Sequence, residues 1–335
     1  MSMKQKIVPF VAKAVRAAGL LGLLASRCGG RGVILAFHDI VRGNDPVNRA
    51  GSVSAEFLER ALQYIAQSGL EPVPLSQIPA RLEEPGKERF IALTFDDGYK
   101  SALEIAAPLL ERYRIPATVF VTSGRLGAET DYKWEGLAHY IAGHDHIAVG
   151  PFWAATKTLA QKQAAYRKLT RLVRGGHEMW RHHLDEFFTA QGMDVPSLVR
   201  EKFLDAQGVK ALAQSPMIEI GGHSVSHANL AQLGEEEAFA EIVKNKTDLE
   251  ELLGREVSSF AYPYGGDQAC GEREFALARA AGYRLAVTMR SASVAARDNL
   301  FALPRFGVSG LYESEAVLSL YLSGAWTGLR RVFHR

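Results

Sequence analysis

Two adjacent carboxylates follow an apolar run in the first third of the chain. Residues 91–95, Ile-Ala-Leu-Thr-Phe, have the composition of a buried strand and end in Asp96-Asp97-Gly98. Successive side chains point in different directions, so one carboxylate can hold a metal ion while its neighbour takes a proton. The alternative is a simple turn, because Asp-Gly is a common turn pair and acidic residues cap helices.

Two histidines four residues apart follow a second apolar run. Residues 218–220 lead through Gly221-Gly222 to His223, and His227 comes four positions later. If a helix begins there, both imidazoles share a face and reach one ion; otherwise the spacing is a surface coincidence. Together with one aspartate, two histidines make three protein ligands and leave a position open for water, as in catalytic zinc sites.

A third apolar run breaks into a Pro/Gly loop that carries two aromatic side chains, Tyr262 and Tyr264. Such a loop can aim a backbone N–H, for instance that of Tyr264, at a developing oxyanion. The rings of Tyr262, Tyr264 and Trp134 could stack on a sugar, although core packing would use the same residues. An ordinary loop between a strand and a helix is the alternative.

Two more polar residues lie at or in expected strands. His38 follows the first apolar run, and Arg305 lies in the last one. His38 would meet the three motifs above at one edge of a sheet, although an isolated histidine there is more often structural. Arg305 could orient a carboxylate or make a structural ion pair.

The elements that would position these residues are short β-branched runs alternating with helical periodicity. This alternation is typical of an α/β fold with a parallel sheet, and the carboxyl ends of such strands form the active-site edge of α/β barrels. One helix is expected at 54–68, capped by Ser54. The expected strands are 33–37, 90–95, 117–121, 218–220, 257–262, 283–288 and 303–308.

The expected organisation is one barrel with attachments. We expect the barrel over residues 31–325, with a helical insertion at about 130–215 and a basic tail at 326–335. Residues 1–30 read as a basic amphipathic helix, whose longest apolar stretch, 17–25, is too short to span a bilayer. This helix would lie on an anionic membrane surface through residues 4–27 or pack on the barrel, and a secretory signal is a further reading.

Composition excludes several classes of protein. The 335 residues are 47% hydrophobic and 23% charged, which excludes a disordered chain. The net charge of +2 gives no reason to expect nucleic acid as a partner. The two cysteines, Cys28 and Cys270, form no disulfide framework. We therefore expect free thiols and a location in the cytoplasm or on the cytoplasmic face of the inner membrane, rather than secretion.

The motifs resemble the signature blocks of a known family. Residues 94–98, 223–227 and 262–265, in this order, look like those of the NodB-like polysaccharide deacetylases, carbohydrate esterase family four. The resemblance covers roughly residues 32–308 and implies an α/β fold of the distorted (β/α)₇ TIM-like barrel type. It also implies metal-dependent removal of the acetyl group from an N-acetylated sugar.

By this resemblance Asp96 is the general base, and the loop at Tyr264 supplies the oxyanion contact. The implied metal ligands are Asp97, His223 and His227. The implied cofactor is a divalent metal, first of all Zn²⁺, with Co²⁺, Ni²⁺ or Mn²⁺ as other candidates.

Two departures from the family pattern change the assignment. Many members carry an arginine where this chain has Ala261, so Arg305 becomes the candidate to steady Asp96. Many members also carry a late catalytic histidine that this chain lacks. The early His38 instead resembles the poly-N-acetylglucosamine deacetylase branch, in which the acid histidine comes first, and this makes His38 the expected general acid.

The expected function is therefore a metal-dependent deacetylase. The glycan would be a chitooligosaccharide, poly-N-acetylglucosamine or an envelope or lipid-linked glycan. One alternative is an amidohydrolase acting on a small ureido or formyl amide. Another is a catalytically silent glycan-binding protein, but a silent copy would tolerate loss of Asp96 or of a metal ligand, and none is missing.

Overall fold

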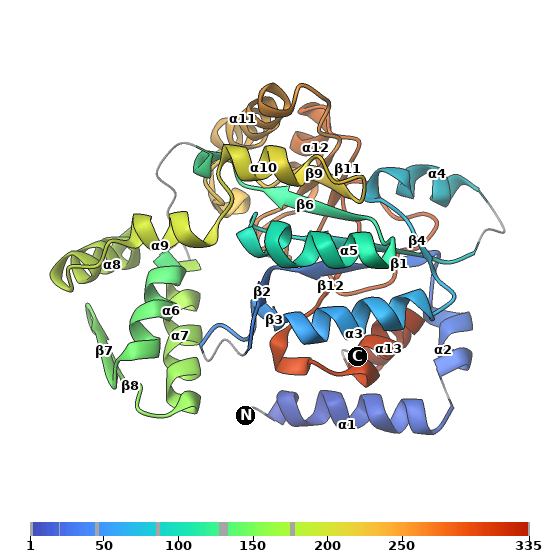
Figure 1. Ribbon diagram of the computed structural model, residues 1–335, viewed down its shortest axis with the longest axis horizontal. Coiled ribbons are helices and arrows are strands. Elements are labelled where there is room, and N and C mark those ends of the chain that lie inside the picture. The colour runs from blue at the N-terminus through green and yellow to red at the C-terminus, as the bar shows by residue number, and fades with distance from the viewer. Residues whose placement is uncertain are drawn as a thin grey trace.

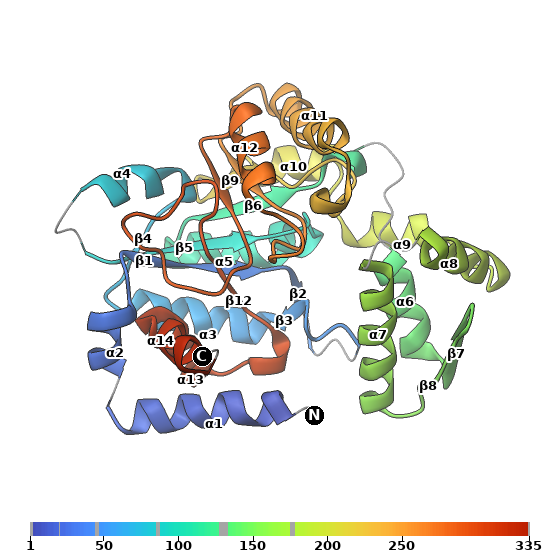
Figure 2. The same ribbon diagram turned by 180° about the vertical axis from the view of Figure 1, so that it is seen from behind.

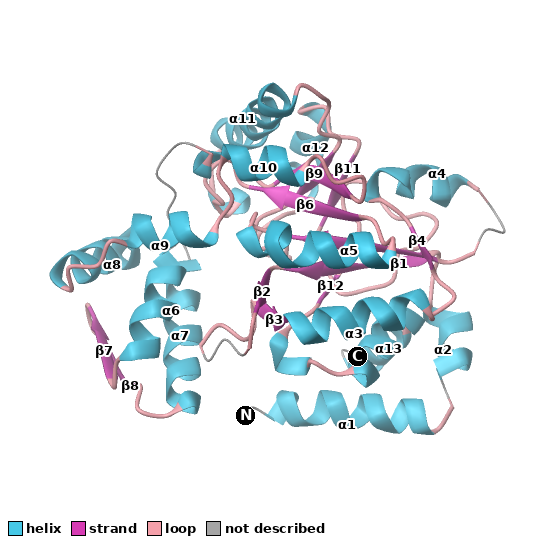
Figure 3. Ribbon diagram, viewed as in Figure 1, coloured by secondary structure: helices cyan, strands magenta, loops and turns pink. Residues whose placement is uncertain are grey.

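Parallel strands form a curled sheet at the centre of the computed structural model (Figure 1; Figure 3). The structure describes residues 3–19, 21–43, 47–84, 88–126, 133–174 and 178–333. The strand order along the sheet is β11-β10-β9-β6-β5-β1-β12, with β4 paired to β5 at its side. The expected α/β architecture, a distorted seven-stranded barrel, is confirmed.

The strands lie close to where the sequence predicted them. The last three are shorter than predicted, and β9 extends two residues further through its glycines. The main-sheet strands are β1 (Gly32–Phe37), β4 (Glu71–Pro72), β5 (Phe90–Phe95), β6 (Ala117–Val121), β9 (Ile218–Gly222), β10 (Ser259–Ala261), β11 (Leu285–Val287) and β12 (Phe306–Gly307). Two further pairs lie outside this sheet: β2 (Asp39–Val41) with β3 (Ser52–Ser54), and β7 (His146–Val149) with β8 (Phe152–Ala155).

Side chains of the central strands alternate between the helical layer and the barrel interior, as the two-residue period of a strand requires. In β5, Ile91 and Leu93 belong to the core shared with the helices, whereas Phe90 and Ala92 belong to the core inside the barrel. Asp96 continues the second series, beyond the last residue of the strand. The alternation therefore directs Asp96 inward, toward the barrel axis.

Helices cover the outer face of the sheet (Figure 1; Figure 2). The expected helix at 54–68 is α3 (Ala55–Ala66), and the hydroxyl of its cap, Ser54, accepts a hydrogen bond from the Phe57 N–H. The other barrel helices are α4 (Ile78–Glu83), α5 (Ala107–Tyr113), α10 (Ala206–Leu212), α11 (Glu235–Leu253), α12 (Glu272–Ala280) and α13 (Glu315–Ser323).

The insertion follows β6 and projects from one side of the barrel (Figure 1, green to yellow). It contains α6 (Lys133–Gly143), α7 (Leu159–Arg174), α8 (Glu178–Ala190) and α9 (Val195–Lys202). Two corrections apply to the predicted helical segment 130–215. It includes the antiparallel pair β7–β8, and its last helix, α10, packs on the barrel helix α11. The rest has its own apolar core, which includes Leu137, Leu169 and Leu184.

The N-terminal segment forms two helices where we expected one. These are α1 (Met3–Ala17) and α2 (Leu21–Cys28), and α1 packs along α13 with Ala12 fully buried. Within the described ranges, no single helix has the length and apolar character needed to cross a bilayer; one pair of segments, Val8–Ala17 and Leu21–Cys28, qualifies only when joined across a bend of 105°. Membrane contact through residues 4–27 stays a prediction.

Over its described residues, the C-terminal segment is not the tail that we expected at 326–335; residues 334–335 lie outside the described part. Residues Ala325–Phe333 form α14, which packs against α2 and α13. Ala325 is fully buried, and the ring of Trp326 meets the Tyr321 ring edge-on, at 5.8 Å between centroids. Apolar contact with the two neighbouring helices therefore holds this helix on the barrel.

Candidate active site

The predicted ligand residues converge at the carboxyl ends of neighbouring strands. Asp97 follows β5, and His223 follows β9, which lies two strands away across β6. The Asp97 Oδ1 atom lies 3.4 Å from His223 Nε2 and 3.2 Å from His227 Nε2. All three side chains are buried, and their ligand atoms lie within 4.8 Å of one another. The structure therefore brings the sequence-predicted triad together.

The chemistry of these donors suits a divalent cation. The Nδ1 atom of His223 lies 2.7 Å from the Ala261 carbonyl, which can only accept a hydrogen bond, so Nδ1 carries the proton and Nε2 keeps its lone pair. Burial raises the pKa of Asp97, but the neighbouring imidazoles of His223 and His227 outweigh that effect and hold the pKa well below the ordinary value. An ionised carboxylate and two imidazole nitrogens form a donor set typical of Zn²⁺ and similar ions.

The two histidines reach this place through a loop, not through the helix that was one reading of their spacing. Residues 223–229 are irregular, and His227 lies in the left-handed region with φ 60°. The hydroxyl of Ser224, itself left-handed, accepts a hydrogen bond from the His227 N–H at 3.0 Å. A helix is therefore not what brings the two imidazoles together, although both do face one point.

Several residues of the site's loops have strained, left-handed backbone conformations. Among the described residues other than glycine, five have positive φ, and all but the helix-capping Arg114 belong to the site's loops. The four are Asp97 at 72°, Ser224 at 59°, His227 at 60° and Tyr264 at 63°. Such conformations cost roughly 1 kcal/mol or more each, so surrounding contacts must impose them.

Helix α11 supplies many of those contacts. The carboxylate of Glu241 accepts hydrogen bonds from the N–H groups of Val225 and Ser226, both at 2.9 Å, and from the Ser226 hydroxyl at 2.8 Å. One turn further along, the side-chain oxygen of the buried Asn245 accepts the His223 N–H at 2.9 Å. Sequence reasoning missed both supports, although a polar residue on the apolar side of α11 was a usable signal for Asn245.

Asp96 lies beside the triad and is held by a buried arginine. Arg305 donates from its two terminal nitrogens to the two carboxylate oxygens of Asp96, at 2.7 and 2.8 Å. It also donates to the Thr94 hydroxyl at 2.9 Å and to the Thr288 carbonyl at 3.0 Å, and its side chain is fully buried. Burial raises the pKa of Asp96, but the charge and hydrogen bonds of Arg305 outweigh it, so the pKa lies below the ordinary value.

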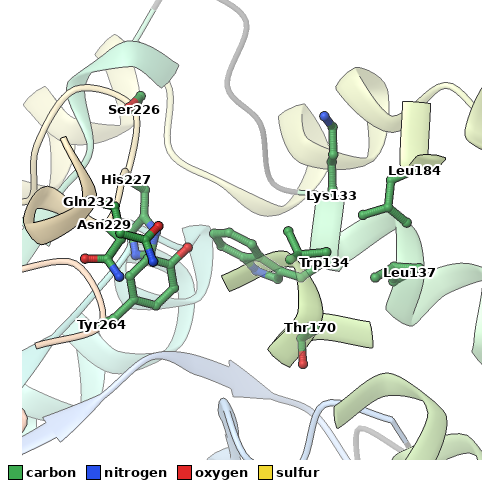
Figure 4. Close-up of a pocket in the computed structure, with 11 residues that line it drawn as sticks. Lys133, Trp134, Leu137, Thr170, Leu184, Ser226, His227, Asn229, Gln232 and Tyr264 are labelled. Atoms are coloured by element: carbon green, nitrogen blue, oxygen red, sulfur yellow. The ribbon is translucent and has the colours of Figure 1, made fainter. Parts of the chain in front are cut away.

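A cleft of about 790 Å³ opens over these carboxylates. His38 lines it, with Nε2 at 4.0 Å from Asp96 Oδ2. Trp134 and Tyr264 line it as well, and both rings pack on the His227 ring, at 5.2 and 4.8 Å between centroids. Figure 4 shows the Trp134 ring directed toward His227 and Tyr264 across the gap. These three predicted site residues therefore share one cavity with the triad.

Tyr262 does not share that cavity, and the prediction that it offers a ring to substrate is wrong. Its side chain is fully buried, and its hydroxyl donates to the Phe301 carbonyl at 2.9 Å. The strand alternation explains this, because Phe260 and Tyr262 point into the core under the helices while Ala261 points into the barrel. Tyr262 is a core residue.

The insertion builds a wall of the cleft that sequence reasoning missed. Helix α7 contributes Tyr166, Arg167, Thr170 and Arg171 to the lining. The insertion is tied to the barrel by Glu135, whose buried carboxylate accepts the Tyr99 hydroxyl at 2.9 Å and the Lys202 ammonium at 2.5 Å. The local sequence gave no signal for this wall, because α7 reads as an ordinary amphipathic helix.

Known proteins with similar sequences include polysaccharide deacetylases. The family model for polysaccharide deacetylases matches residues 83–286. YxkH of Bacillus subtilis, assigned by name to the polysaccharide deacetylases, is 20% identical over 278 residues, which are 82% of this chain and 71% of that protein. The poly-beta-1,6-N-acetyl-D-glucosamine N-deacetylase of Escherichia coli K12 is 24% identical over 173 residues, which are 51% of this chain but only 24% of that protein.

A solved structure agrees in fold. The Streptococcus pyogenes deacetylase PplD, solved in complex with acetate, superposes with a TM-score of 0.58 at 17% identity, and the alignment covers 86% of this chain and 96% of that one. At this identity the likeness establishes the curled α/β barrel. The solved structure and this chain therefore share a fold, and in this chain that fold holds the buried Asp-His-His group described above.

Proposed function

This chain belongs to the polysaccharide deacetylase family, and we propose that it is a metal-dependent hydrolase that removes the acetyl group from an N-acetylated amino sugar of a glycan. The observation that carries the proposal is the convergence of Asp97, His223 and His227, with the separately held carboxylate of Asp96 beside them. A structural metal site would not need that fourth group.

Amide hydrolysis makes three demands on the site. Water must be activated, the tetrahedral oxyanion must be stabilised, and the departing amine must be protonated. A divalent cation bound by Asp97, His223 and His227, which we propose to be Zn²⁺, would supply a Lewis acid that lowers the pKa of water. The remaining tasks fall to side chains and backbone of the chain itself.

Asp96 takes the proton of the attacking water. Its pKa lies below the ordinary value, so the carboxylate is ionised at neutral pH and ready to accept. Arg305 positions it, because two parallel hydrogen bonds fix the plane of the carboxylate. The Tyr264 N–H donates to the oxyanion, and His38, whose Nε2 atom lies 4.0 Å from Asp96 Oδ2, protonates the leaving nitrogen.

The cleft favours a sugar over a small amide. Its volume of about 790 Å³ lies within the range of roughly 300–1,000 Å³ that holds drug-sized ligands, which a small ureide would leave largely empty. The rings of Trp134 and Tyr264 offer apolar faces to a pyranose. A chitooligosaccharide or a poly-N-acetylglucosamine segment is therefore the first substrate class to test.

The test combines metal analysis with acetate release from N-acetylglucosamine oligomers. Asp96→Asn should keep its metal and lose about 10²- to 10⁴-fold in kcat, the usual contribution of a general base. His223→Ala should lose the metal itself. The control is His182→Ala, on the exposed surface of α8, which should keep both its metal and its kcat.

Two outcomes would count against the proposal. Near-normal turnover by Asp96→Asn would remove the base assignment. A metal-loaded protein that releases ammonia or formate from small amides, but no acetate from oligosaccharides, would favour the amidohydrolase alternative.

A further inference from the structure

Two arginines of helix α7 line the cleft together with the catalytic groups. Arg167 and Arg171 line the same cavity as Asp96, Asp97 and His38. They are four residues apart, so they lie on one side of the helix, next to Thr170. Figure 4 shows Thr170 on α7, on the far side of Trp134 from Tyr264 and His227. Arg167 and Arg171 therefore belong to the wall that α7 contributes to the cleft.

The packing of α7 fixes the direction in which this wall faces. Ala165 and Leu169 are buried in the insertion's own apolar core, as is the body of Tyr166. Arg167 and Arg171 are exposed. The helix cannot turn these arginines away without withdrawing Leu169 from that core.

The charge of the cleft is unbalanced. Among the residues that line it, only Asp96 and Asp97 are acidic. Asp96 is paired with Arg305, and Asp97 faces His223 and His227. The guanidinium groups of Arg167 and Arg171 have no ion pair or hydrogen bond with any other residue that the structure describes. The cleft thus carries two guanidinium groups that no described carboxylate neutralises.

A guanidinium group presents a planar fork of donors that matches a carboxylate or a phosphate. A neutral N-acetylglucosamine chain offers no such group. We propose that Arg167 and Arg171 bind an anionic substituent of the glycan, so that the substrate is an acidic N-acetylated saccharide. This inference rests on the proposed function and adds a class of substrate to it. The anion is a phosphate ester or a uronic acid carboxylate, and the experiment separates the two sources.

The experiment measures binding and turnover on three matched oligosaccharides. All contain N-acetylglucosamine; one is neutral, one carries a phosphate and one a uronic acid. The metal-loaded full chain with Asp96→Asn serves for equilibrium binding by calorimetry, and the native chain serves for kcat/KM. The acidic oligosaccharides should bind at least about tenfold more tightly than the neutral one, and this preference should weaken as salt is raised.

Variants locate the effect. Arg167→Gln together with Arg171→Gln should reduce the acidic-over-neutral ratio of kcat/KM by about tenfold or more. Lys168→Gln removes one positive charge from the same helix, but Lys168 packs over the Phe152 ring at 5.3 Å and does not line the cleft, so its ratio should stay that of the native chain.

The outcomes are distinct. A preference for the phosphorylated or for the uronic acid oligosaccharide supports the proposal and names the source of the anion. Equal affinity for the neutral and acidic compounds, or an undiminished ratio in the double variant, overturns it. Failure of the proposed function would look different, because the native chain would then release no acetate from any of the three, while calorimetry would still report on the anion site.

Discussion

Replacing Arg305 with methionine should destabilise the protein strongly, and in a pH-dependent way. The Arg305 side chain is fully buried and donates four hydrogen bonds, two of them to Asp96, which is only 3% exposed. Methionine replaces the stem but leaves the Asp96 carboxylate buried without its counter-charge. Breaking a buried pair in this way costs about 3–5 kcal/mol, so the free energy of unfolding at pH 7 should fall by that amount.

The pH dependence follows from the direction of the Asp96 pKa. In the native chain the folded pKa is lowered from 3.8, so this group's contribution to stability is present above the unfolded pKa and is lost as pH falls through the folded pKa. Without Arg305, burial dominates and raises the folded pKa above 3.8. The folded variant then binds the proton more tightly than its unfolded chain does, so its stability falls as pH rises through that window.

The assay is urea unfolding of both proteins between pH 4 and pH 7, with a chelator present throughout so that metal release does not contribute. The difference in unfolding free energy should be largest at pH 7 and shrink by roughly half or more at pH 4. The control is Asp96→Asn with Arg305→Met, which removes both charges. Its destabilisation should be smaller than that of the single variant and nearly independent of pH.

The reasoning would be refuted by a single variant that loses less than about 1 kcal/mol, because a desolvated carboxylate cannot lose its counter-charge so cheaply. A loss that is equal at pH 4 and pH 7 would refute the pKa argument specifically. It would mean that Arg305 acts through packing alone.

Two further predictions concern groups around the site. Glu241→Ala should weaken metal binding by about tenfold in a chelator competition, because the loop that carries His227 loses three hydrogen bonds, whereas Glu237→Ala, exposed on the same helix, should not. Burial raises the pKa of the Cys270 thiol to about 12, so in a Cys28→Ser background it should react with iodoacetamide at pH 8 far more slowly than after unfolding. Equal rates before and after unfolding would contradict this.

The strands and the chemistry at their ends could be predicted from the order of residues in the chain. A buried parallel strand is a local pattern of consecutive apolar residues, and the residue that follows it lies at the active-site edge whatever the rest of the chain does. Asp96, Asp97 and His38 were located in this way. The burial of Tyr262 could also have been predicted, because Tyr262 lies two residues after Phe260 and therefore on the same face of the strand, which packs in the core.

The tertiary structure alone decided how distant segments meet. The loop 223–229 carries two left-handed residues, and contacts from Glu241 and Asn245 on a distant helix help to hold the imidazoles toward Asp97. Likewise, the position of Arg167 and Arg171 depends on the separate apolar core of the insertion and on the attachment of Glu135 to Tyr99. Such contacts join residues far apart in sequence, so they cannot be predicted from local sequence patterns.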